Sequence, residues 1–154
     1  MTDKDLTAYC GLFCGDCMRY MSRASELASE LLGEFEKTQF SEYARVKQSQ
    51  IADYGHYESM KSFLSQVVRL RCETPCRLGG DGCIGPCPIV ECVKGKSLEG
   101  CWQCAQYRGC PKFGSLKPFC GDTPEHNLTK IKEHGPEAWA KHRGKFYPWK
   151  KEKP

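Results

Sequence analysis

Thiol groups dominate the chemistry that this sequence could perform. The chain holds 12 cysteines in 154 residues, and most of them fall into groups with short spacings. The groups are Cys10-x3-Cys14-x2-Cys17, Cys72-x3-Cys76, Cys83-x3-Cys87-x4-Cys92, Cys101-x2-Cys104-x5-Cys110, and Cys120 alone. A Cys-x2-Cys turn lets two sulfur atoms converge on one metal ion, and two such elements complete a tetrahedral site of four sulfurs. The spacing therefore predicts metal binding, with all 12 cysteines as candidate ligands.

Zinc is the expected ion, at about two or three per chain, because structural zinc sites commonly consist of four thiolates. Iron–sulfur clusters are the alternative, since they use the same ligands. Disulfide bonds are a second alternative. The N-terminal residues, however, contain no basic start followed by an apolar stretch and a cleavage site. We therefore expect a cytoplasmic protein, whose reducing surroundings favour metal ligation over disulfides.

The apolar composition gives a separate reason to expect metal. Leu, Ile, Val and Phe together account for 27 of 154 residues, below the roughly 20% that usually supports a self-sufficient core. The net charge is only +4, which argues against a disordered chain. A structural zinc site can supply on the order of 10 kcal/mol of folding free energy, comparable with the net stability of a whole domain. Metal ions would thus compensate for a thin core.

Hydrophobic periodicity predicts three helices in the first half of the chain. The clearest spans residues 16–37, where Asp16 would lie near the positive end of the helix dipole. Its apolar stripe, which we expect to lie in the core, consists of Met21, Ala24, Leu27, Ala28, Leu31, Leu32 and Phe35. Two further helices are expected at 41–53 and 57–71, separated by residues 54–56.

The second half of the chain has little periodicity until residue 123. Residues 72–120 contain nine cysteines and eight glycines, so we expect an irregular lobe. A helix should follow, with Thr123 as its N-cap, Pro124 in its first turn and Gly135 at its end. A short turn is expected around Trp139.

These elements predict a mainly α protein with an irregular, cysteine-rich, metal-stabilised lobe and little β structure. Only nine residues are Val or Ile, which argues against an extended sheet. We expect one domain, residues 1–154. Its parts would be a helical region at about 16–71, a zinc lobe at about 72–120 completed by Cys10–Cys17, and a C-terminal helix with a basic tail at 123–154.

Positive charge is concentrated at the C-terminal end. Residues 141–154 carry six Lys or Arg against one Glu and include Phe146, Tyr147 and Trp149. Such a segment could contact nucleic acid through phosphate neutralisation and base stacking. The alternative, which we favour, is that the aromatic side chains pack back onto the domain.

No sequence motif indicates catalysis. The glycine-rich run at 79–82 lacks the Lys-Ser/Thr ending of a P-loop, and the four histidines are distant from the cysteine groups in sequence. A closed site of four thiolates leaves no open position for a reactant. We therefore expect a zinc-binding protein of unknown biochemical activity that acts as a metal-stabilised binding or adaptor module rather than as an enzyme; its partner is not identified by the sequence, and a protein is one candidate. The alternatives are an iron–sulfur electron-transfer protein and a small zinc or thiol enzyme. No apolar run is long enough to span a membrane.

Two segments resemble a known family. They are YCGLFCGDCMRY at 9–20 and CPIVECVKGKSLEGCWQCAQYRGCPKF at 87–113, and they resemble the cysteine-rich prokaryotic domain-of-unknown-function family 3795. The match spans most of residues 6–113, and the family's cysteine pattern falls here on Cys10, Cys14, Cys17, Cys72, Cys76, Cys87, Cys92, Cys101, Cys104 and Cys110. Cys83 and Cys120 are additional to that pattern. The resemblance implies a metal-binding protein, with zinc as the expected ion, and no settled activity.

Overall fold

The computed structural model describes residues 1–80 and 85–150. These residues are mainly helical, and their only β pairing consists of two isolated bridges, Thr7 with Phe13 and Tyr20 with Cys72. The predicted fold class is thus confirmed, whereas its metal stabilisation stays a prediction. The chain divides into two compact units, one of residues 21–71 and the other of residues 1–20 together with 72–154. Cys83, a candidate ligand, lies outside the described residues.

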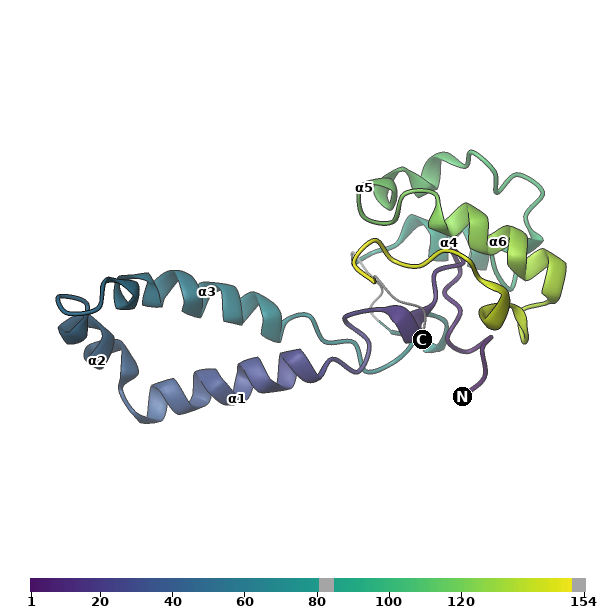
Figure 1. The fold of residues 1–154 in the computed structure, drawn as a ribbon. Helices are drawn as coiled ribbons and strands as arrows, with labels where there is room; N and C mark the ends of the chain where they lie inside the picture. Colours follow the sequence, from purple (N-terminus) through teal and green to yellow (C-terminus); the bar gives the residue numbers. More distant parts are fainter. Residues whose placement is uncertain (81–84, 151–154) are drawn as a thin grey trace. The chain divides into compact units, whose positions relative to one another are not determined.

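The unit of residues 21–71 is a helical hairpin with a cap of short helices. Its elements are α1 (Arg23–Lys37), α2 (Phe40–Lys47), the 3-10 helix η2 (Ala52–His56) and α3 (Tyr57–Val68). Helices α1 and α3 lie side by side (Figure 1). Aromatic rings pack where α1 meets α2 and α3, and the rings of Phe35 and Phe40 stack with centroids 4.5 Å apart. This aromatic contact and the helix pairing form the small core of the unit.

Two of the sequence-based expectations for α1 are wrong. The helix begins at Arg23 rather than at residue 16, because Ser22 is its N-cap and accepts a hydrogen bond from the Ser25 N–H at 3.3 Å. The apolar stripe is also only partly buried, since Leu27 and Leu31 are 49% and 42% exposed. The reason is geometric, because α3 packs against only one side of α1, and the apolar residues at the edge of that side stay exposed to solvent.

The other two helices of this unit differ from expectation mainly at their ends. The helix expected at 41–53 ends at Lys47, and residues 54–56, expected to separate two helices, belong to η2 instead. Helix α3 begins at Tyr57 as predicted and ends at Val68, three residues before the expected end at residue 71. In the described parts of the chain, no helix is both long enough and apolar enough to cross a membrane.

The second unit contains short helices around one core. Its elements are η1 (Cys14–Asp16), η3 (Cys76–Leu78), α4 (Pro88–Gly95), η4 (Cys101–Gln103), η5 (Pro111–Ser115), α5 (Lys117–Cys120), α6 (Thr123–His134) and η6 (Trp139–His142). The segment 72–120 is therefore more helical than the sequence suggested. Helix α4 was missed, although Pro88 at its first position and buried Ile89 and Val93 four residues apart are its signals.

Helix α6 is the best-predicted element of this unit. Pro124 lies in its first turn, and Gly135 ends it with a positive φ of 76°, a conformation that favours glycine. The N-cap, however, is Asp122 rather than Thr123. The Thr123 hydroxyl instead donates to the carbonyl oxygen of Phe146 at 3.2 Å, so a tertiary contact replaces the expected cap.

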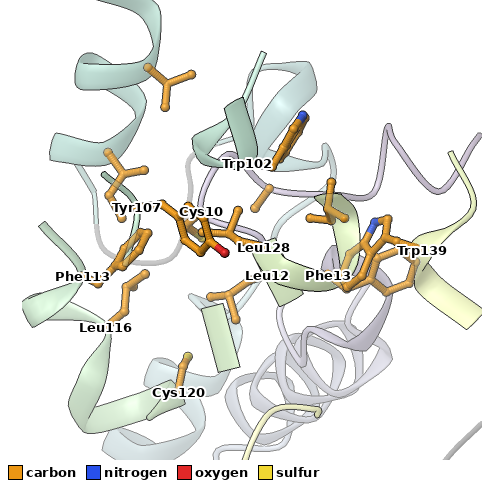
Figure 2. Packing of buried hydrophobic residues seen from close by; sticks show 14 of the residues in the cluster. Cys10, Leu12, Phe13, Trp102, Tyr107, Phe113, Leu116, Cys120, Leu128 and Trp139 are labelled. Atoms are coloured by element: carbon orange, nitrogen blue, oxygen red, sulfur yellow. The ribbon is translucent and has the colours of Figure 1, made fainter. Parts of the chain in front are cut away.

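The core of this unit forms where α6 packs against the N-terminal segment (Figure 2). Leu128 of α6 is fully buried, and Trp139 in η6 is also 0% exposed. The Trp139 indole N–H donates to Thr7 Oγ1 at 2.8 Å, and its ring meets Phe13 edge-on at 5.8 Å. Because an indole N–H needs a partner when buried, this hydrogen bond fixes the ring between two distant parts of the chain.

Candidate metal centre

Four cysteines from two distant parts of the sequence line one small cavity. Cys14 and Cys17 flank the turn η1, whose Cys17 N–H donates to the Cys14 carbonyl at 2.9 Å. Cys72 is held beside them because its N–H donates to the Arg19 carbonyl at 2.8 Å, and Cys76 follows at the start of η3. These four side chains surround a cavity of about 30 Å³, which Ala8, Arg19, Tyr20 and Tyr147 complete. We call this cavity the first thiol site.

The thiols of the first site are buried close to one another. Burial raises the pKa of the Cys14 thiol, and the nearby thiols of Cys76, Cys17 and Cys72 also raise it, against a hydrogen bond from the Cys76 backbone N–H that lowers it; together they bring the pKa to about 11. Burial also raises the pKa of Cys76. The Cys72 Sγ–H donates to the Thr74 carbonyl at 3.0 Å. In the absence of a cation, Cys14 and Cys76 therefore carry protons at neutral pH.

A second group of four cysteines lines a larger cavity. Cys92 comes from α4, Cys101 and Cys104 bound the short helix η4, and Cys110 precedes η5. The cavity has a volume of about 220 Å³. Burial, and to a smaller degree the nearby thiols of Cys110, Cys104, Cys92 and Cys87, raise the pKa of Cys101 to about 12. We call this cavity the second thiol site.

Neither site is already closed around a metal position. Among residues 1–80 and 85–150, no three His, Cys, Asp or Glu side chains converge as a ready-made set of metal ligands. A tetrahedral zinc site with Zn–S bonds of about 2.3 Å brings its sulfurs within about 3.8 Å of one another. A cysteine side chain has a single rotatable χ1 bond with three staggered positions, so its sulfur can swing while the backbone stays in place. The backbone thus gathers the thiols, and closing a site requires side-chain rotation.

The other candidate ligands among the described residues, Cys10, Cys87 and Cys120, line neither cavity, although the nearby Cys17 thiol adds to the effect of burial in raising the pKa of Cys120. Cys10 and Cys120 are 8% and 4% exposed and belong to the hydrophobic core (Figure 2). Cys87, the N-cap of α4, is close enough to influence the pKa values of both Cys76 and Cys101. Among the residues that the structure describes, no histidine lines either thiol cavity. His134 instead stacks on His142, with ring centroids 3.9 Å apart.

Asp16, between two thiols of the first site, has a role that the sequence did not reveal. It does not cap a helix: its side chain is 4% exposed and accepts two hydrogen bonds from the Arg143 guanidinium, both at 3.0 Å. The Lys150 ammonium group donates to the same carboxylate at 2.6 Å. Arg143 also lies over the ring of Phe13, 4.4 Å from its centroid. No local pattern could have paired residues 127 positions apart.

The rest of the described tail also packs back onto this unit. Tyr147 is 5% exposed, lines the first thiol site, and stacks on Trp149 with centroids 4.7 Å apart. Lys145 pairs with the exposed Asp122 carboxylate. The sequence analysis considered Tyr147 for base stacking or for packing onto the domain, but it did not predict that this side chain lines the first thiol site.

The structure thus defines a cysteine-rich, mainly helical protein whose thiols gather around two cavities. Residues 6–115 match the family model described as Protein of unknown function (DUF3795), and the chain belongs to this family. No curated protein and no solved structure matches the chain.

Proposed function

We propose that this protein is a zinc-stabilised binding module, with a zinc ion held at the first thiol site by Cys14, Cys17, Cys72 and Cys76. The observation that supports this most directly is the joint lining of one cavity of about 30 Å³ by two cysteine pairs that lie far apart in the sequence. Four thiols are the donor set of a structural zinc site, and the cavity is small enough to suit a single ion.

The backbone around the site also suits a metal turn. Cys14 and Cys17 lie three residues apart on the turn at η1, whereas Cys72 lies in the bridge with Tyr20 and Cys76 begins η3; the Cys76 N–H points at the sulfur of Cys14. Backbone N–H groups directed at ligand sulfurs stabilise thiolates once a cation replaces their protons. A zinc ion here would also join the N-terminal segment to residue 72, where the chain returns to this unit.

A structural role for the ion fits the composition of the chain. Four thiolates fill the coordination sphere of zinc, so a closed site offers no position to a substrate. The exposed apolar side chains of the helical hairpin, such as Leu27 and Phe63 at 49% and 67% exposure, provide surface for a protein partner. In this proposal the zinc ion maintains the fold, and the exposed apolar surface of the helical hairpin binds a protein partner.

The test is a zinc measurement on matched cysteine variants. Protein purified in reductant is analysed by mass spectrometry of the elements, and cobalt substitution reports ligand type through its absorption spectrum. Cys76→Ser should lose one zinc equivalent and the tetrathiolate cobalt spectrum. Cys120→Ser, which changes a buried cysteine that lines neither cavity, should keep both. Equal zinc contents in the two variants, or wild-type protein without zinc, would overturn the proposal.

A further inference from the structure

The two thiol sites differ sharply in size. Each is lined by four cysteines, but the first cavity has a volume of about 30 Å³ and the second about 220 Å³. We propose that the second site binds a cluster of four irons and four sulfides through Cys92, Cys101, Cys104 and Cys110. This proposal does not depend on zinc at the first site.

The main support for a cluster is the volume of the second cavity. An apolar cavity of about 150 Å³ already accommodates a molecule of benzene, so a cavity of about 220 Å³ has far more room than one metal ion occupies. A single zinc ion would draw four sulfurs to within about 3.8 Å of one another and collapse this space. A four-iron cluster places its own irons and sulfides between the four cysteine sulfurs, which therefore stay further apart.

The elements around the cavity hold the four cysteines from different sides. The Cys101 N–H donates to the Tyr9 carbonyl at 2.9 Å, which ties the start of η4 to the N-terminal segment. The Cys110 N–H donates to the Tyr107 carbonyl at 3.3 Å. Cys92 lies on α4, next to Val93, which is 2% exposed. Three separately anchored segments thus supply the four thiols that line this cavity.

The lining of the cavity suits a cluster in charge and polarity. Ile89, Val93 and Phe113 are each 2% exposed and form an apolar wall. Lys96 and Lys112 also line the cavity, where their ammonium groups can offset the negative charge of a thiolate-bound cluster. Burial among apolar side chains and nearby positive charge are two of the factors that set the potential of such clusters.

The test is anaerobic reconstitution of the full chain with sulfide and equal amounts of ferrous and ferric iron, which supply the two ferrous and two ferric ions of an oxidised four-iron cluster. The expected product is brown, contains four irons and four sulfides per chain, and bleaches when dithionite reduces it. X-ray absorption at the iron edge should show iron–iron scattering, which a mononuclear site lacks. Colourless protein with zinc bound at both sites would overturn the proposal, as would iron without iron–iron scattering. These wild-type measurements are decisive even if a variant fails to fold.

Two cysteine variants separate this proposal from the zinc site. Cys104→Ser should lose the cluster absorption and most of the bound iron, while its zinc at the first site is retained. Cys76→Ser should show the opposite pattern, with zinc lost and cluster retained. Loss of iron to the same extent in both variants would show that the iron is not held at the second site. Circular dichroism of each variant checks that the fold is kept.

Discussion

Replacing Asp16 by alanine should destabilise the protein far more than its position in a turn suggests. The carboxylate and the Arg143 guanidinium are 4% and 9% exposed, and two hydrogen bonds of 3.0 Å join them. Removing one partner of a buried pair leaves the other charge uncompensated, which costs about 3–5 kcal/mol. Lys150 is 28% exposed and can turn toward water, so the cost falls on Arg143.

The expected loss is large compared with the whole stability of a domain of this kind. Net stabilities are about 5–15 kcal/mol, and each kcal/mol shifts the melting temperature of a chain of this size by roughly 2–4 °C. The Asp16→Ala variant should therefore melt about 6–20 °C below wild type when both proteins are scanned as purified in reductant.

A matched control distinguishes burial from ion pairing in general. Asp122→Ala removes a carboxylate that pairs with Lys145. Both side chains are exposed, at 72% and 42%, and the Asp122 side chain makes no capping hydrogen bond to α6 although it occupies the N-cap position, so the melting temperature should hardly change. The double variant Asp16→Ala/Arg143→Met removes both buried charges and should recover part of the loss. If Asp16→Ala melts at the same temperature as Asp122→Ala, the carboxylate is not the buried anchor that its contacts indicate.

Two further predictions concern one glycine pair and one thiol. Gly11→Ala should lower the free energy of unfolding in urea, because φ is +87° and the new Cβ would lie 2.9 Å from Leu128 Cγ. Gly33→Ala, in the open flank of α1, should raise it by about 1 kcal/mol, and an equal effect of both changes would contradict this reasoning. The pKa of Cys14 is raised to about 11, so metal must displace its proton at any lower pH. Chelator competition should therefore show zinc affinity falling at least about tenfold per unit decrease in pH, and a pH-independent affinity would exclude Cys14 as a ligand.

The parts of the fold that the sequence predicted correctly have local causes. Helix α6 was found because Pro124 and Gly135 act on the backbone where they stand, whatever packs against them. The metal ligation that the cysteine spacing predicts stays a prediction. Which pairs meet was not predicted, because Cys14 and Cys72 are brought side by side by a backbone contact between residues 19 and 72.

The parts that the sequence missed depend on distant contacts. Asp16 suits the first turn of a helix as a residue type, and only its contact with Arg143 shows that it anchors the tail instead. The stripe of α1 indicates a helix face correctly but not how much of that face is covered. Residues such as Leu31 remain exposed because a helical hairpin has few other elements to cover them.

The described tail illustrates why net charge alone is a poor guide to partners. Residues 141–154 have a strong positive excess in sequence, yet Arg143 and Lys150 both contact Asp16, and Lys145 contacts Asp122. Of the tail's aromatic side chains, Tyr147 is 5% exposed, and Trp149, which is 47% exposed, stacks on it. Nucleic-acid binding through this segment would have to break these contacts before phosphate pairing or base stacking could replace them.

The distribution of cysteines relates metal binding to one unit of the chain. Residues 21–71 contain no cysteine, and their aromatic contacts form without any metal. In the other unit, seven partly buried cysteines pack against the edge of the hydrophobic core: Cys14, Cys17, Cys76, Cys87, Cys101, Cys104 and Cys110. Metal ions bound by these cysteines would add stabilising contacts at the edge of the hydrophobic core, where there are few further apolar side chains. Metal loss should therefore loosen that unit first, because its core continues into the ligands, whereas the helical hairpin has no ligand to lose.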